Sequence, residues 1–391
     1  MVAKKRILTI AFSDLKSDPR VNRQLLFLKS WDDMEITAAG FSDPEISGIE
    51  FIKVTQAKPR GLAGKLYAAF ILMLGLFRRF YWANESVTSA LRCLGEFECD
   101  IILANDLNTL PVAVYLARRN GAKIFLDCHE YTPREFDDKP TFRLLFRKYW
   151  GYICTTYLAY VDVKTTVCES IAQEYKNNYG GNWEVITNAP FFEALKASGV
   201  SGEQIRMVHH GAAHPSRKLE KMIQLVGLLD EKFKLDFMLI NHESTYAKSL
   251  MRMAERNPSI RFREPVRMID IVRELNQYDI GLCLIWPKAF NYEMALPNKL
   301  FEFVQARLAV ATWPSPEMAK IVRKYGCGVV SDDYSVGSMA KCLNQLSSED
   351  IMLFKEASNK AAAILWAETN MEKFNQLVNS LLASSKDSPK A

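Results

Sequence analysis

The apolar positions of the chain fall in short continuous runs that alternate with longer amphipathic stretches. In the first half, these runs predict strands at 6–12, 35–41, 49–54, 100–104, 123–128, 161–167 and 183–187. Between them, apolar residues spaced three or four apart predict helices at 20–30, 62–94, 110–120, 142–160 and 170–177. Strands that are apolar throughout and alternate with helices are typical of a parallel sheet buried on both faces.

The same alternation restarts after a loop-like stretch at 188–203. Strands are predicted at 205–209, 235–240, 260–263, 279–284, 308–312 and 328–331. Helices are predicted at 217–229, 246–256, 268–276, 298–306, 316–325, 351–367 and 371–382. We therefore predict an α/β protein of two Rossmann-like domains, 1–190 and 204–355, whose ligands bind in a cleft beyond the carboxyl ends of the strands.

The end of the chain is expected to behave differently from the two domains. Helices at 356–383, including Trp366 and Glu368, are predicted to pack back on the first domain. The polar tail at 384–391 is predicted to be disordered.

Composition agrees with this organisation and excludes some functions. A chain of 391 residues is too long for one ordinary core. Its net charge of +5 is far from the dense basic surface that nucleic acid binding requires. The eight cysteines form no C-x-x-C pair, which indicates reduced, buried thiols. The N-terminus runs into the first strand without a signal-like apolar region, so we expect a cytoplasmic protein.

One apolar run invites a membrane interpretation. Residues 66–77 are apolar or glycine and lie between Lys65 and Arg78, but about twenty residues are needed to cross a bilayer. Two alternatives remain: a helix buried against the sheet, or a helix that also touches a membrane surface through its basic flanks. The stretch 140–160, rich in arginine, lysine and aromatic residues, leaves a similar choice between core packing and a face for a lipid-linked acceptor.

The segment most informative about chemistry is L-P-N-K-L-F-E-F at 296–303. It predicts a turn that leads into a helix, with Lys299 in the first turn and Glu302 one turn later. Free backbone N–H groups at a helix start suit a diphosphate, and a carboxylate can accept two hydrogen bonds from a ribose diol. On spacing alone, an ordinary helix start with both side chains in solvent is the simpler interpretation.

A family resemblance changes that weighting. The segment P-N-K-L-F-E-F, followed by R-L-A-V at 307–310, resembles the donor-site signature of the GT4-like group of GT-B glycosyltransferases. Six further pieces resemble the same group in the same order, at 17–21, 105–111, 127–130, 163–172, 188–190 and 210–220. Together they span nearly the whole chain. The resemblance implies the GT-B fold and a hexosyltransferase-like, retaining transfer from a nucleotide-diphosphate sugar, without a cofactor or metal.

The resemblance also implies roles for particular residues. His129 and Glu130, in D-x-H-E after a first-domain strand, are its candidate catalytic residues, with His129 facing the donor sugar. In the second domain it implies a nucleotide-sugar site of five residues: Arg217, Lys218, Asn298, Lys299 and Glu302. Cations fixed there would stabilise the negative charge of the departing nucleotide.

Three features depart from the family pattern or compete with it. Met294 stands where many relatives carry a glutamate for the donor sugar, which leaves that sugar open. Ala212 stands where many relatives carry an arginine, a role that Arg217 would take. His209, His210 and His214 are close enough to raise a metal site, but Gly211 and Pro215 break any helix that would align them.

The expected partners are a nucleotide-sugar donor and an envelope polysaccharide, glycolipid or other glycan acceptor. Residues 62–82 and 140–160 are candidates for peripheral contact with the inner face of a membrane. Two rival functions stay open: a nucleotide-sugar epimerase, which shares the fold, and a catalytically silent GT-B subunit that pairs with an active transferase.

Overall fold

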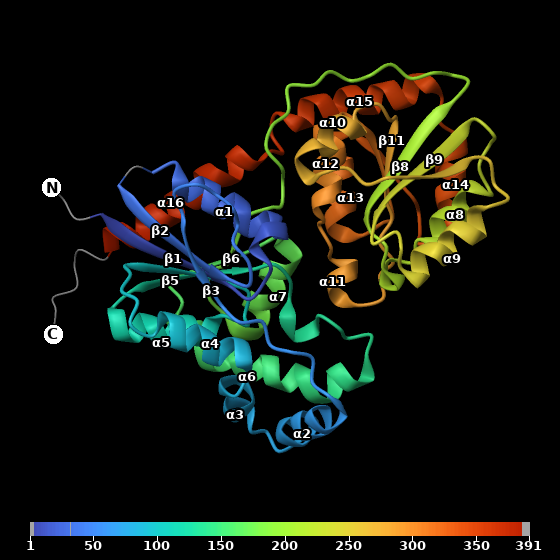
Figure 1. Ribbon diagram of the computed structural model, residues 1–391. Helices are drawn as coiled ribbons and strands as arrows, with labels where there is room; N and C mark the ends of the chain where they lie inside the picture. The colour runs from blue at the N-terminus through green and yellow to red at the C-terminus, as the bar shows by residue number, and fades with distance from the viewer. Residues whose placement is uncertain (1–3, 32, 385–391) are drawn as a thin grey trace. The chain divides into compact units, whose positions relative to one another are not determined.

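The computed structural model describes residues 4–31 and 33–384, which divide into two compact units (Figure 1). As far as they are described, unit 1 comprises Met1–Thr187, Ala289–Asn291 and Met371–Ala391, and unit 2 comprises Asn188–Lys288 and Tyr292–Asn370. Of the predicted disordered tail, Ser384 is the last residue of a helix, and 385–391 lie outside the described residues.

Unit 1 is built on a parallel sheet of the described strands in the order β3-β2-β1-β4-β5-β6-β7. The strands are β1 (Lys5–Ala11), β2 (Met34–Gly40), β3 (Glu50–Lys53), β4 (Ile101–Asn105), β5 (Lys123–Cys128), β6 (Val163–Thr166) and β7 (Glu184–Val185). Every residue of β4 is buried, as expected for a strand covered on both faces. This is the doubly wound arrangement that the sequence predicts.

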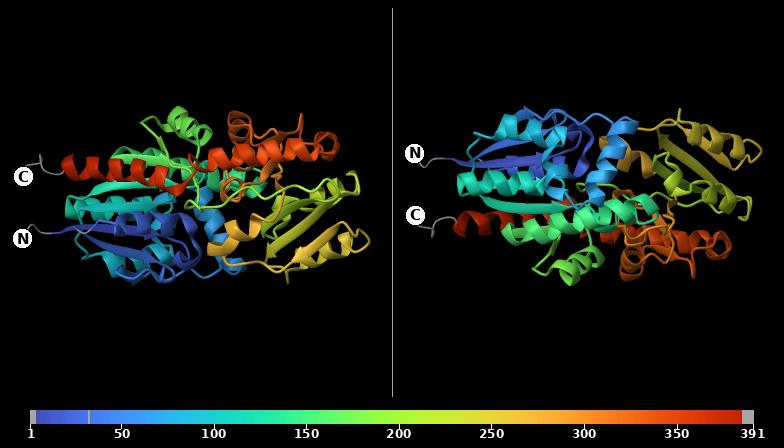
Figure 2. Two further views of the ribbon diagram at one scale, coloured as in Figure 1. Left: turned by 90° about the horizontal axis from the view of Figure 1, so that it is seen from above. Right: turned by 90° about the horizontal axis from the view of Figure 1, so that it is seen from below.

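Helices cover both faces of this sheet (Figures 1 and 2). The helices of unit 1 are α1 (Pro19–Lys29), α2 (Leu62–Met73), α3 (Phe77–Trp82), α4 (Glu85–Leu94), α5 (Leu110–Asn120), α6 (Arg147–Tyr157), α7 (Glu169–Tyr179) and most of α16 (Ala367–Ser384). Of these, α2 and α3 pack on other helices and not on the sheet. The α1 and α16 helices lie on one face, where Phe374 contacts Phe27 and Phe125. The α4 and α5 helices lie on the other face.

Unit 2 repeats the plan with a parallel sheet in the order β10-β9-β8-β11-β12-β13. The strands are β8 (Ile205–Ala212), β9 (Phe233–Ile240), β10 (Ile260–Arg263), β11 (Ile280–Cys283), β12 (Ala309–Thr312) and β13 (Gly328–Val330). The helices are α8 (Glu220–Val226), α9 (Thr245–Ala254), α10 (Ile271–Leu275), α12 (Asn298–Gln305), α13 (Pro316–Tyr325), α14 (Val336–Asn344) and α15 (Ser348–Ala362). The short helix α11 (Phe290–Glu293) is divided between the two units, with Phe290 and Asn291 in unit 1.

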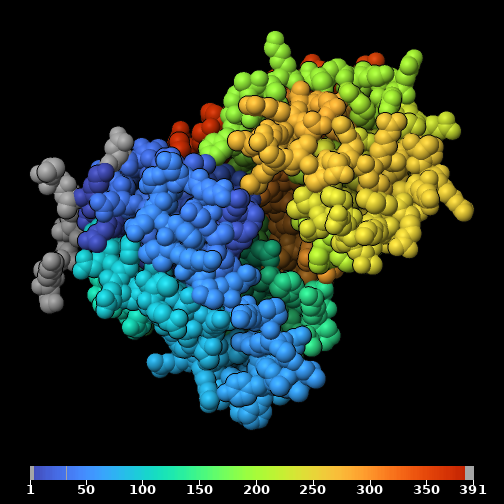
Figure 3. All heavy atoms as spheres, in the orientation of Figure 1, coloured from blue at the N-terminus to red at the C-terminus, as the bar shows by residue number. Residues whose placement is uncertain are grey.

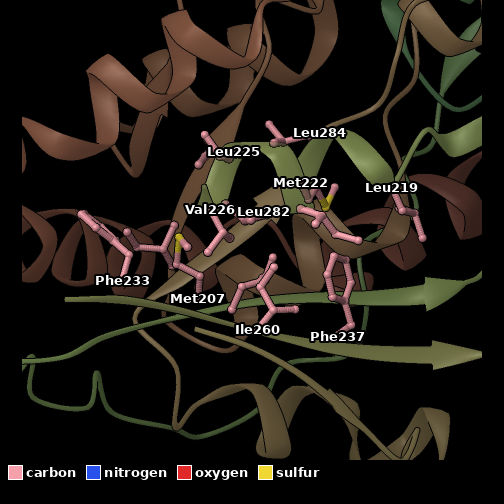
Figure 4. Packing of buried hydrophobic residues seen from close by; sticks show 14 of the residues in the cluster. Met207, Leu219, Met222, Leu225, Val226, Phe233, Phe237, Ile260, Leu282 and Leu284 are labelled. Carbon is pink, nitrogen blue, oxygen red and sulfur yellow. The ribbon is translucent and has the colours of Figure 1, made fainter. Parts of the chain in front are cut away.

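The core of unit 2 shows why its strands are apolar throughout (Figure 4). Met207, Phe237 and Leu282, from three neighbouring strands, meet Met222 and Leu225 of α8, and all five are essentially inaccessible. On the other face, α12 packs close to β11 because Gly281 has no side chain. A methyl group there would lie 2.3 Å from the ring of Phe303. This close approach holds the start of α12 near the carboxyl end of the sheet.

Three sequence predictions about helices need correction. The predicted helix 62–94 is three helices, α2, α3 and α4. The last of them begins at Asn84, whose side chain accepts the N–H of Ser86. The predicted helix 217–229 starts later, since Lys218 has a left-handed backbone with φ of 54° and α8 follows it. The helix α14 is absent from the prediction.

The predicted return of 356–383 to the first domain also differs from the structure in its bounds. Helix α15 packs on α12 and β12 within unit 2, and only residues from Met371 onward belong to unit 1. Trp366 belongs to unit 2, where its ring lies 5.3 Å from that of Phe192. Glu368 lies in unit 2 as well.

Within the described part of the chain, no helix is long and apolar enough to span a membrane. All eight cysteines are free thiols. Six of them are buried, as predicted, whereas Cys93 is exposed and Cys342 is partly exposed.

Candidate functional site

The candidate catalytic histidine of unit 1 follows β5 directly and is held by its neighbours. Its backbone N–H donates to Oδ1 of Asp106 at 2.8 Å, and its Nδ1 lies 3.3 Å from Oδ2 of the same carboxylate. Asp106 follows β4 with a left-handed φ of 64°, a conformation that costs a non-glycine residue free energy. The turns after two adjacent strands thus fix the ring of His129.

The other ring nitrogen of His129, Nε2, is buried and has no hydrogen-bond partner among the described residues. It lies 3.8 Å from Oδ2 of Asp127. Each ring nitrogen therefore lies near a carboxylate, Nδ1 near Asp106 and Nε2 near Asp127. A buried polar atom without a hydrogen-bond partner is unusual, and Nε2 is therefore a candidate to bond a ligand.

Beneath His129 lies a buried ion pair that the sequence analysis missed. Arg20 donates to both carboxylate oxygens of Asp127, each at 2.6 Å, and Thr165 donates to Oδ1 at 2.6 Å. Burial opposes ionisation of Asp127, but the guanidinium and the hydroxyl outweigh it and hold the pKa of Asp127 below its usual range. Asp18 caps α1 and so presents Arg20 from its first turn.

Glu130, the second candidate catalytic residue, contacts Asn291. Its carboxylate accepts a hydrogen bond from the side chain of Asn291 at 3.2 Å, and its side chain is exposed. The Asn291 side chain also exchanges two hydrogen bonds with the backbone of Tyr131, at 3.0 and 3.2 Å. Residues 289–291 thus brace the loop after β5, and Glu130 is part of that brace.

In unit 2, two cations meet at the end of β8. Gly211 has a φ of +116°, and a methyl group on it would come within 3.0 Å of Arg217 Nη1 and 3.5 Å of Lys299 Nζ. The Lys299 ammonium donates to the carbonyl of His210 at 2.9 Å. Only a residue without a side chain leaves room for both cations beside the strand end.

The buried histidine next to Lys299 is neutral. His209 Nδ1 lies 2.9 Å from the carbonyl of Leu282, which only accepts, so Nδ1 carries the proton. Its Nε2 therefore offers a lone pair to Lys299 Nζ at 3.4 Å. Burial and the nearby ammonium lower the pKa of His209 well below its ordinary value. Burial and the charge of Arg217 in turn lower the pKa of Lys299 to about 7.

The remaining candidate donor residues lie on or beside α12. Asn298 is its first residue, at the end of the helix where backbone N–H groups lack partners within the helix. Glu302, one turn on, has Oε2 3.2 Å from Nε2 of His210. The structure thus brings Arg217, Lys299 and Glu302 to the end of β8. Lys218 is different, because it is exposed and lies 3.5 Å from the carboxylate of Glu220.

The three neighbouring histidines do not converge. His209 bonds a backbone carbonyl, His210 faces Glu302, and His214 Nδ1 accepts the N–H of Ser216. Among residues 4–31 and 33–384, no group of three or more His, Cys, Asp or Glu side chains is placed to hold a metal ion.

Comparisons with known proteins identify the fold of the chain. No protein-family model matches the chain, and no curated protein matches it in sequence. Among solved structures, TarM from S. aureus matches at 14% identity and a TM-score of 0.61, over 76% of this chain but only 59% of its own length. HepE from Anabaena, crystallised with UDP-glucose, matches at 12% identity and a TM-score of 0.65, over 96% of this chain and 99% of its own. Sucrose-phosphate synthase from Thermosynechococcus elongatus matches at 11% identity and a TM-score of 0.71, over 97% of this chain and all of its own. Likenesses at such low identity concern the backbone, and on that ground the chain has the two-Rossmann-unit fold of the GT-B glycosyltransferases, as its sequence predicts.

Proposed function

We propose that this protein is a glycosyltransferase that moves a sugar from a nucleotide-diphosphate sugar to a glycan acceptor. The observation that carries the proposal is the meeting of Arg217 and Lys299 at Gly211, beside the first turn of α12. Two cations and a helix start are suited to the two negative charges of a diphosphate. The likeness to HepE, which was crystallised with UDP-glucose, supports a nucleotide sugar as the donor.

The neighbouring groups fit the rest of a nucleotide sugar. The Glu302 carboxylate would accept hydrogen bonds from both ribose hydroxyls, and Asn298 would present backbone N–H groups to the phosphates. As the bond between sugar and diphosphate breaks, charge grows on the departing phosphate oxygen, where Lys299 and Arg217 stabilise it. Because two fixed cations supply this charge, we propose a metal-independent reaction. Retention at the anomeric carbon is carried over from the sequence resemblance.

We assign the sugar side of the reaction to His129. Its Nε2 is without a described hydrogen-bond partner, and Asp106 fixes the ring through both the backbone and Nδ1. A histidine held in this way is suited to orient a sugar hydroxyl and to exchange a proton with it. Glu130 would act beside it, from the loop that Asn291 braces. For the acceptor we propose an envelope polysaccharide, a glycolipid or a related glycan.

A thermal-shift panel tests the donor site directly. Wild type and Glu302→Ala are heated with UDP, GDP, ADP, dTDP or CMP. A ligand at one hundred times its dissociation constant adds about 2.7 kcal/mol to the free energy of unfolding, which is easily detected. We expect one nucleoside diphosphate to raise the melting temperature of the wild type and to lose most of this effect in Glu302→Ala.

The opposite outcomes point to the rival functions. If no nucleotide stabilises the wild type, with or without magnesium, the donor site is wrong and a silent partner subunit is the better explanation. If a nucleotide binds but its sugar is isomerised without any added acceptor, the protein is an epimerase. Product analysis by mass spectrometry and NMR separates that case from transfer.

A further inference from the structure

Helix α2 of unit 1 is apolar on both sides, but only one side is covered by protein. Ala68, Ile71 and Leu72 are buried against the unit. The opposite side exposes large apolar residues spaced three or four apart, so that they form one stripe. Their exposed fractions are 77% for Leu62, 64% for Leu66, 54% for Phe70 and 64% for Met73. Figure 3 shows this part of the chain, in blue, at the outer edge of unit 1.

The chain around the stripe is predominantly basic, although Glu85 lies at its edge and accepts the backbone N–H of Lys58. Residues 57–83 contain five basic side chains and no acidic one: Lys58, Arg60, Lys65, Arg78 and Arg79. None of the five forms an ion pair with any residue that the structure describes. A second segment of unit 1, residues 139–160, contains four basic residues and again no acidic one. The apolar stripe therefore lies in a mainly positive field.

Two hollows adjoin α2 and continue the same chemistry. One, of about 720 Å³, lies between Lys65 and Leu72 of α2 and the aromatic Phe146, and its wall includes Arg60 and one carboxylate, Glu85. The other, of about 740 Å³, follows the end of α2 and is lined by Phe77, Trp82 and Tyr152 together with Arg78 and Arg79. Each combines an apolar lining with cationic side chains, which is the chemistry of a phospholipid's acyl chain and headgroup.

We propose that α2 docks unit 1 on the surface of an anionic lipid bilayer, with the stripe Leu62, Leu66, Phe70 and Met73 among the upper acyl chains. An exposed apolar stripe of this size is unusual on a monomeric protein and marks an interaction site. An apolar groove on a partner protein would cover the stripe but not account for the basic residues around it. Five cations without an ion pair match a negatively charged layer of lipid headgroups. At twelve residues α2 is too short to cross the bilayer, so it lies in the interface.

This docking rests on the proposed function only in giving the transferase a reason to work at a membrane. It concerns residues that take no part in donor binding, so the two proposals fail separately. A transferase that needs a lipid-linked acceptor meets it by lying on the same surface.

Vesicle co-sedimentation of the full chain tests the proposal. The vesicles are phosphatidylcholine alone, or phosphatidylcholine with phosphatidylglycerol. The test variant is Leu66→Ser/Phe70→Ser/Met73→Ser, whose residues are exposed and so tolerate the change. The matched control carries Leu228→Ser/Ile269→Ser/Leu353→Ser, equally exposed apolar residues of unit 2. A charge variant carries Arg78→Gln/Arg79→Gln.

We expect the wild type and the unit 2 control to bind the anionic vesicles and to leave neutral ones largely unbound. The α2 variant should bind at least ~100-fold more weakly, because three apolar side chains no longer enter the acyl layer. The charge variant should lose roughly fivefold for each arginine, and added salt should weaken the wild type. The nucleotide thermal shift should be the same in all these proteins.

Three results would overturn the proposal. The first is a wild type that stays in the supernatant with anionic vesicles. The second is an α2 variant that binds these vesicles as well as the wild type does. The third is a wild type that does not bind vesicles but forms a dimer in light scattering, while the α2 variant is a monomer. The stripe would then be a face between two copies of this chain.

Discussion

The Nζ atom of Lys299 lies 3.4 Å from Nε2 of His209, in a pocket where neither side chain meets a carboxylate at hydrogen-bond distance among the described residues. Both groups are buried, and Arg217 adds a further positive charge nearby. Without a bound anion, this pocket holds more positive potential than it can neutralise. The lysine responds with a pKa of about 7, against an ordinary value of 10.5.

Diphosphate affinity should therefore depend on pH. A bound diphosphate favours the ammonium form of Lys299 and raises its pKa, so binding takes up a proton once the pH exceeds about 7. We expect the dissociation constant of the preferred nucleoside diphosphate to rise between pH 7 and 9, approaching tenfold per pH unit. Calorimetry in buffers of different ionisation enthalpy would measure both the constant and the proton uptake. A flat profile would show that Lys299 stays charged in the free protein.

The variant Lys299→Met provides the control, and its effect on stability has a definite sign. Between about 7 and 10.5 the unfolded chain binds a proton that the folded chain has lost, so the free energy of unfolding rises with pH in this window. In the variant the part of that rise due to Lys299 should disappear, as should the pH dependence of nucleotide binding, whereas the part due to Lys355, whose pKa burial lowers to about 8, should remain. Urea denaturation at several pH values measures the first effect.

Adjacent residues Arg217 and Lys218 should behave very differently. The arginine reaches Gly211 beside Lys299, whereas the lysine is exposed and close to Glu220. Arg217→Ala should weaken nucleotide binding about 10- to 100-fold, the value of one or two hydrogen bonds between charged groups. Lys218→Ala should change it by less than about threefold. Equal losses in a titration of both variants would mean that the loop rearranges around the ligand.

Much of this fold could be predicted because its signals are local. The apolar runs predict most strands to within two residues, and four elements, α5, β5, β10 and α13, have the same bounds as predicted. Helix α14 was not predicted because Gly337 and Ser338 weaken its apolar periodicity, and only its residues Met339, Ala340 and Leu343 are buried. The exposed stripe on α2 was predicted only in part, because an apolar run does not indicate which side of a helix is covered.

The sites were predictable only as far as their residues are close in sequence. Lys299 and Glu302 share one short helix, and D-x-H-E contains both Asp127 and His129. The pairing of Arg20 with Asp127 joins positions 107 residues apart, and that of Asn291 with Tyr131 joins positions 160 apart. The spacing of apolar residues along the chain cannot predict such distant pairs. Arg20, Asp106 and Asp127 all lie within the motifs that resemble the GT4-like group, so the sequence did mark these positions. The motifs do not indicate which residues they contact.

His129 should matter for the reaction and not for donor affinity. We expect His129→Ala to lower kcat at least ~100-fold, in the range of a lost general acid or base, with an unchanged thermal shift by the nucleotide. Asp106→Asn keeps the shape of the side chain but weakens its interaction with Nδ1 of His129, so we expect kcat to fall about tenfold. Steady-state kinetics with the identified donor measures both. A His129→Ala enzyme with wild-type kcat would exclude a catalytic role.

The contact between Gly281 and Phe303 connects the core of unit 2 with its donor site. Gly281→Ala would put a methyl group 2.3 Å from the Phe303 ring, in a core that has no room, so α12 must move. We expect a loss of about 1–3 kcal/mol in the free energy of unfolding, together with weaker nucleotide binding because Lys299 and Glu302 move with the helix.

Gly337→Ala is the matched control for this variant, since no atom lies within 4 Å of the added methyl group and the site is in helix α14. It should be neutral or stabilise by up to about 1 kcal/mol, because alanine favours helix more than glycine does. Urea denaturation and nucleotide titration distinguish the two variants. If Gly281→Ala lowered stability but left nucleotide affinity intact, α12 would be positioned by contacts other than its packing on β11, such as those with α15.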